Sequence, residues 1–282
     1  MRSVRRFSVA VAVFLIALGA AVGASASGSN AGALANGHWR ATLHYQSLPS
    51  AVFPRVSDLR LRVTRDGKAV YDRTVPLPRD CMTDGCSLLR GPGGRSFELR
   101  DLGLPSGPAA VIWFWTGGAH CCTVVHIVSM PDGRAAVRNF GDPGARIVDL
   151  GGQYLFRSAD DRFAYVFTSF AASAFPVQLW RFRNGRLTNV TRDFPDTIAA
   201  DAAQLWRGVL SQRARHGEVR GVFAAWAADQ CALGKQAVVA KELATGVARG
   251  IFSQPRGEPE GLAGARYAAA LRQHLRQWGY CR

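Results

Sequence analysis

The sequence predicts an α+β protein in which an antiparallel β region precedes a C-terminal helical bundle. Between residues 38 and 195, apolar and polar residues alternate over short runs that end at turn-forming dipeptides. After residue 195, the apolar residues recur at helical spacing instead. The 282 residues are 48% hydrophobic, which allows a packed core and excludes an intrinsically disordered chain.

The N-terminus has the pattern of a secretory signal peptide. Three arginines precede an uncharged run over 9–22, and Ala24-Ser25-Ala26 then supplies the small residues of a cleavage site. We expect residues 1–26 to be removed, because the run is shorter than the ~20 apolar residues of a spanning helix. An uncleaved membrane anchor is the alternative. The pattern predicts a secreted or cell-envelope protein with no transmembrane segment in the mature chain.

Residues 27–37, rich in Gly, Ser, Ala and Asn, predict a flexible leader. The β region, 38–195, follows, and it holds three hairpin signatures in which a dipeptide ending in glycine separates two runs with strand character. These dipeptides are Asp66-Gly67, Asp132-Gly133 and Asn184-Gly185. The runs 110–115 and 163–170 predict strands buried on both faces. An antiparallel meander of about a dozen strands fits this span.

The helical region, 196–282, is predicted from caps and apolar stripes. Asp196 can cap a first helix, a second runs over 219–233 and stops at Gly234, and a third covers about 235–247. The last helix has an apolar stripe formed by Tyr267, Leu271, Leu275 and Trp278.

The charge balance is strongly basic, with 35 Lys+Arg against 20 Asp+Glu and a formal charge of +15. The arginines are scattered and no nucleic-acid-binding motif is present, so the sequence does not favour nucleic acid as the partner. For an exported chain, an anionic envelope polymer or a protein partner is favoured.

Six cysteines follow the predicted signal peptide and suit an oxidising compartment. Cys81 and Cys86 enclose a turn-forming Asp84-Gly85 and can pair across it, while Cys231 and Cys281 can staple two helices. Cys121 and Cys122 remain. They can bridge to each other only with a distorted peptide, and they can instead pair with Cys81 and Cys86.

One cluster could carry chemistry. If residues 120–126 form a strand, His120, Cys122 and His126 point to one face, where they could bind zinc or copper. The structural alternative has Gly117-Gly118 as a tight turn and the thiols oxidised. No hydrolase, phosphate-loop or dinucleotide motif is present, so no catalytic residue and no cofactor is predicted.

Two segments, 97–107 and 111–122, the second ending in Thr-Gly-Gly-Ala-His-Cys-Cys, resemble a group of exported bacterial proteins of unassigned function. Their repeats look like degenerate FG-GAP or VCBS-type β-propeller repeats, and 146–153 with 158–167 suggest a second copy. The resemblance covers roughly residues 95–282 and implies a partial, propeller-like β-repeat region. Each loop offers one carboxylate, Asp101 or Asp149, which is too few for the 6–8 oxygen ligands of calcium.

Taken together, these patterns favour an exported, non-enzymatic binding or structural module of the bacterial envelope, whose basic surface engages an anionic partner. The alternative is a metal-handling protein, or a thiol- or histidine-dependent enzyme, centred on the His-Cys-Cys segment.

Overall fold

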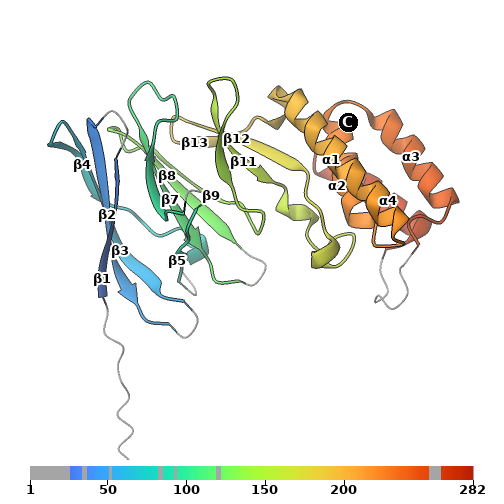
Figure 1. Ribbon diagram of the computed structural model, residues 1–282, viewed down its shortest axis with the longest axis horizontal. Coiled ribbons are helices and arrows are strands. Elements are labelled where there is room, and N and C mark those ends of the chain that lie inside the picture. The colour runs from blue at the N-terminus through green and yellow to red at the C-terminus, as the bar shows by residue number, and fades with distance from the viewer. Residues whose placement is uncertain are drawn as a thin grey trace, which may run out of the picture.

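The computed structural model describes residues 26–33, 37–50, 53–81, 85–91, 94–118, 122–253 and 262–281. In these residues, thirteen strands form three antiparallel sheets, and four α-helices follow. The sheets lie side by side in a row, with the helices at the end of the row opposite the N-terminal sheet (Figure 1). The fold is therefore α+β, with the strands first and the helices last, as predicted.

The N-terminal sheet, here called sheet A, has one buried and one exposed face. Its strands, in spatial order, are β1 (Ala26–Ala33), β2 (Trp39–Leu48), β3 (Arg55–Arg65) and β4 (Lys68–Thr74). In β3, Leu61 and Val63 are buried, whereas Arg60 and Arg62 are exposed. This alternation places the apolar residues towards the neighbouring sheet and the arginines towards solvent.

Strand β1 corrects the expectation of a flexible leader over 27–37 for its described residues 27–33. It pairs antiparallel with β2 over eight residues, from Ala26 opposite Ser47 to Ala33 opposite Arg40. Pairing with a sheet edge uses backbone groups, so a segment of small residues can still complete a sheet. The composition indicated little side-chain packing, but it carried no information about an available strand edge.

The middle sheet, sheet B, is covered on both faces. Its strands are β5 (Ser87–Leu88), β6 (Phe97–Arg100), β7 (Ala109–Trp115), β8 (Thr123–Ser129) and β9 (Ala135–Asn139). On the central strand β7, Ile112 and Phe114 pack in the core shared with sheet A, and Val111 and Trp113 pack in the core shared with the third sheet. The prediction of a strand buried on both faces over 110–115 is confirmed.

The third sheet, sheet C, lies between sheet B and the helices. Its strands, in spatial order, are β10 (Arg146–Asp149), β11 (Tyr154–Ala159), β12 (Val177–Arg183) and β13 (Arg186–Asn189). The hairpin predicted at Asn184-Gly185 joins β12 to β13, and both residues have positive φ, 51° and 73°. The turns at Asp66-Gly67 and Asp132-Gly133 likewise join β3 to β4 and β8 to β9.

The prediction of a strand over 163–170 is wrong. This segment runs through two 3₁₀ turns, η2 (Asp161–Phe163) and η3 (Phe170–Ala172), with Tyr165 between them at a φ of 62°. Phe163 and Phe167 are buried among the helices rather than in a sheet. Apolar residues four apart match a helical turn as well as a buried strand, and the apolar run alone could not separate the two.

The C-terminal bundle follows the predicted order. Its helices are α1 (Pro195–Ala214), α2 (Arg220–Ala232), α3 (Gln236–Ala248) and α4 (Gly264–Gln277). Two further 3₁₀ turns, η1 (Arg79–Cys81) and η4 (Thr191–Asp193), lie before the bundle in the chain. Asp196 lies in the first turn of α1, and Phe194 occupies the cap position predicted for it. On α4, Tyr267, Leu271 and Leu275 are buried, as the predicted stripe requires.

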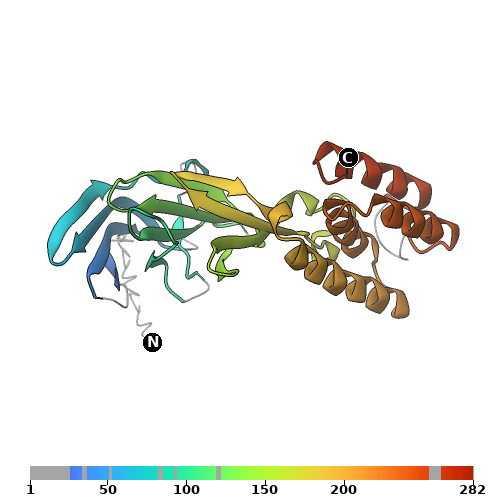
Figure 2. The same cartoon turned by 90° about the horizontal axis from the view of Figure 1, so that it is seen from above.

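Sheets and helices are joined by shared packing. Phe163 and Phe167 belong to the helical core, so contacts cross the predicted division at residues 195 and 196. In the view from above, the sheets lie at one end of the molecule and the helical bundle lies at the other (Figure 2). The described sheets form an open row and do not close into a propeller. Within the described ranges, no helix has the length and apolarity needed to cross a membrane.

Candidate functional site

The described ends of the Thr-Gly-Gly-Ala-His-Cys-Cys motif, residues 116–118 and Cys122, lie directly after β7 and directly before β8. The backbone N–H of Thr116 donates to the carbonyl oxygen of Cys122 at 3.3 Å, so the two ends of the motif lie together. Gly117 has a φ of 92°, which a glycine adopts without a side-chain clash. His120 and Cys121 lie outside the described residues.

A pocket of about 480 Å³ opens beside this motif. The rings of Phe53 and Trp115 meet edge to face there, with centroids 4.1 Å apart, and Phe53 is 43% exposed. Arg55 and Asp80 add one charge of each sign to the lining. The arrangement offers an aromatic surface for a flat or sugar-like ring, together with polar groups that could orient it.

His126 does not reach this pocket. It is 2% exposed, in the middle of β8. Burial lowers the pKa of His126 to about 4, against an opposing hydrogen bond with the backbone of Pro76, so the imidazole is neutral at physiological pH. It lies four residues from Cys122, or about 13 Å along an extended chain, whereas zinc–ligand bonds are about 2 Å long.

The structure therefore does not bring Cys122 and His126 together, and the part of the metal prediction that concerns His120 falls outside the described residues. Cys122 is disulfide-bonded, and a disulfide sulfur is not the thiolate that binds metals. Among the residues with described placement, no group of three or more His, Cys, Asp or Glu side chains could hold a metal ion.

Two disulfides join the cysteines that the spacing paired. Cys81 is bonded to Cys86, and Cys231 is bonded to Cys281. The first lies at the edge of the pocket beside the motif, which Cys86 lines, and the second ties the end of α2 to the segment after α4. The described cysteines include no free thiol.

We expect a thiol-labelling reagent to find no reactive cysteine in the unreduced, denatured protein, because the described cysteines are all oxidised. Mass spectrometry before and after reduction measures this: label should be incorporated only after reduction. Labelling of Cys121 and Cys122 without reduction would contradict the expectation and would favour the thiol-dependent alternative.

The exposed face of sheet A is basic. Arg60 lies opposite His44 on β2, and Arg62 lies opposite Asp72 on β4, so these side chains share one face. The Nε of Arg60 donates to Asp72 at 2.7 Å. This hydrogen bond holds the pKa of Asp72 below its usual value, and the nearby charges of Arg62 and His44 act in the same direction. Arg40 extends the face along β2.

The fold and this face define an α+β protein built from a row of antiparallel sheets, with an exposed basic surface on the terminal sheet. No protein-family model matches the chain, and no solved structure matches it. A protein of Synechocystis sp. (strain ATCC 27184 / PCC 6803 / Kazusa) named "Probable thylakoid lumen protein" is 29% identical over 137 residues. The match covers 45% of this chain and 40% of that protein, so the chain spans less than half of the relative's length.

Proposed function

We propose that the protein is an exported, non-enzymatic module of the bacterial envelope, and that the exposed face of sheet A binds an anionic polymer. The basic face itself carries the proposal: Arg40, Arg60 and Arg62 are exposed there, and Asp72 offsets the charge of Arg60. Arg40 and Arg62 remain available to contact successive anionic groups of a polymer.

Export is supported by three independent features. The N-terminal sequence has the pattern of a signal peptide, the described cysteines are oxidised, and the similar cyanobacterial protein is named for a lumenal compartment. In this proposal, each four- or five-stranded sheet is a degenerate blade-like repeat, and the row serves as a scaffold that presents its terminal face. A purely structural scaffold would need no basic face.

The double variant Arg40→Gln/Arg62→Gln is expected to weaken binding to an anionic polymer by tenfold or more. An arginine close to an anionic surface contributes about 1 kcal/mol, and each 1.4 kcal/mol changes an equilibrium constant tenfold. The measurement is the dissociation constant for dextran sulfate and for a sedimented envelope fraction, at low and at moderate salt. Wild-type binding should weaken as salt rises.

Arg183→Gln/Arg186→Gln is the matched control, since it removes the same charge from exposed positions on sheet C. It should bind nearly as tightly as the wild type. Equal weakening in both double variants would show that only net charge matters, and no binding to the envelope fraction at low salt would refute the proposal.

A further inference from the structure

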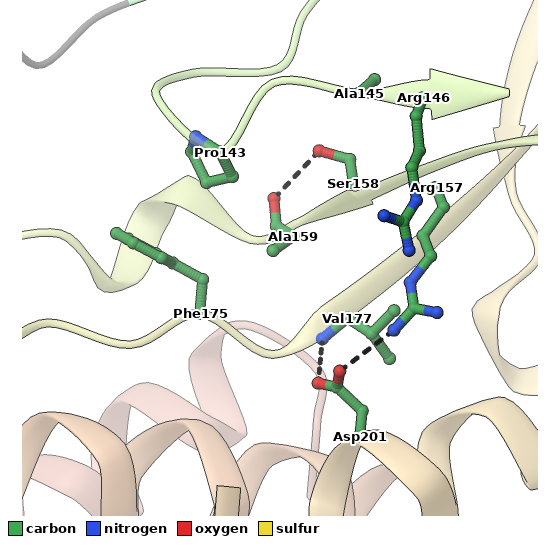
Figure 3. Close-up of a pocket in the computed structure, with 9 residues that line it drawn as sticks. All are labelled: Pro143, Ala145, Arg146, Arg157, Ser158, Ala159, Phe175, Val177 and Asp201. Atoms are coloured by element: carbon green, nitrogen blue, oxygen red, sulfur yellow. Dashed lines mark hydrogen bonds and ion pairs between the residues drawn. The ribbon is translucent and has the colours of Figure 1, made fainter. Parts of the chain in front are cut away.

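Two arginines of sheet C lie directly opposite each other. Arg146 on β10 is the cross-strand partner of Arg157 on β11, so their side chains project from the same face of the sheet, the face towards α1. Figure 3 shows the two side chains next to each other above Asp201. Like charges directly opposite on paired strands destabilise a sheet unless something neutralises them.

The protein itself neutralises the positive charges of Arg146 and Arg157 only in part. Asp201 on α1 accepts a hydrogen bond from Nη2 of Arg157 at 3.3 Å through Oδ1, and from the backbone N–H of Val177 at 3.2 Å through Oδ2 (Figure 3). Both oxygens of this carboxylate are therefore engaged. Within the described part of the chain, Arg146 forms no ion pair, which leaves one positive charge in excess at this place.

The two arginines line a pocket of about 430 Å³ between the edge of sheet C and α1. Its apolar lining residues are Pro143, Ala145, Ala159, Phe175 and Val177, and Ser158 and Asp201 add polar groups beside the two arginines. A guanidinium pair fits the two oxygens of a carboxylate, and apolar walls favour a ligand with a hydrocarbon or aromatic body. Inorganic phosphate would use the charges but not the walls.

We propose that this Arg146–Arg157 pocket binds a small monocarboxylate with an apolar body. The carboxylate lies between the two guanidinium groups and completes their neutralisation, and the body of the ligand packs towards Phe175. This ligand site is separate from the basic face of sheet A, because it lies at the other end of the row of sheets (Figure 1).

The test is calorimetric titration of the full-length protein with benzoate, benzamide and inorganic phosphate. We expect benzoate to bind at least tenfold more tightly than either other probe, because benzamide lacks the charge and phosphate lacks the apolar body. In Arg146→Gln, benzoate binding should weaken tenfold or more, since a hydrogen bond to a charged group is lost. Its unliganded melting temperature should not fall, because the substitution removes a like-charge contact.

Arg183→Gln is the control, because Arg183 and Arg186 form another opposed arginine pair on sheet C, at an exposed hairpin that does not line this pocket. It should leave the benzoate affinity unchanged. Unchanged benzoate affinity in Arg146→Gln, or equal affinity of benzoate and phosphate in the wild type, would overturn the proposal. The absence of benzoate binding in the wild type would also overturn it. Each of these results is independent of whether sheet A binds a polymer.

Discussion

The double variant Cys231→Ala/Cys281→Ala is expected to lower the free energy of unfolding by about 4 kcal/mol. This disulfide spans a sequence separation of 50 residues, and in the chain-entropy model such a loop closure contributes roughly that amount. It ties the buried end of α2 to the penultimate residue of the chain. Urea unfolding followed by circular dichroism measures the loss, and limited proteolysis should show cleavage after α4 first.

The double variant Cys81→Ala/Cys86→Ala is the matched control. Its disulfide spans only five residues, so the same model gives a loss of about 2 kcal/mol. The order of the two losses is the critical result: an equal or larger loss in the control would contradict loop closure as the source of stability. Peptide mapping without reduction should recover Cys231 linked to Cys281, and another partner for Cys231 would refute the pairing.

The tail has other attachments that limit this effect. The hydroxyl of Tyr280 donates to Oδ2 of Asp160 at 2.8 Å, and Nη2 of Arg192 donates to the carbonyl oxygen of Gly279 at 2.7 Å. Both partners precede the helices, so the chain end also contacts the β part. We therefore expect the double cysteine variant to loosen α4 without releasing the tail completely.

The sequence predicted correctly the turns and helix ends that are determined by the residues within them. Asp66-Gly67 and Asn184-Gly185 specify their hairpins through the positive φ that these residues adopt readily, and Gly234 follows the end of α2. The interpretations of 27–33 as a flexible leader and of 163–170 as a strand were wrong, because the cause of each structure lies elsewhere in the chain. The first segment pairs with the edge of β2, and Phe163 and Phe167 pack among the helices.

The candidate sites show the same limit. Alternation along β3 predicted that Arg60 and Arg62 face away from the buried residues, and this is the signal for the basic face. The opposed pair of Arg146 and Arg157 depends on the register between two strands, which the spacing of charges within one strand does not reveal. For His126, the strand period gave its face, and the spacing of four residues already set a separation of about 13 Å from Cys122 along an extended chain, which the metal prediction did not take into account.

Asp229 on α2 is a buried carboxyl group with a strongly raised pKa. Its side chain is inside the bundle, at 1% exposure, and its Oδ2 has no hydrogen-bond partner in the described structure. Burial raises the pKa of Asp229 to about 9, and the charge of Asp201 and its hydrogen bond act in the same direction, whereas Arg157 opposes them. The carboxyl is therefore protonated at neutral pH and can donate to Asp201.

Asp229→Asn is expected to raise the free energy of unfolding at pH 8 by several kcal/mol, with about 6 kcal/mol as the upper limit, and to flatten its pH dependence. In the wild type, folded Asp229 keeps its proton up to about pH 9, but the unfolded residue releases it near 3.8. The stability contributed by this protonated group is complete below the lower value and is lost as pH rises through the higher one. Between them, stability falls by up to about 1.4 kcal/mol per pH unit.

Urea unfolding at pH 5, 7 and 9 tests this expectation, with Asp58→Asn as the control. Asp58 is exposed, and its φ of 51° suits asparagine, so this substitution should leave the wild-type slope in place. An asparagine at 229 has no proton to lose and can still donate to Asp201 through its amide. If Asp229→Asn kept the wild-type slope of unfolding free energy against pH between pH 5 and 9, the buried proton would have to reside on another group. The carboxyl pair of Asp201 on α1 and Asp229 on α2 would then not control the pH dependence of stability.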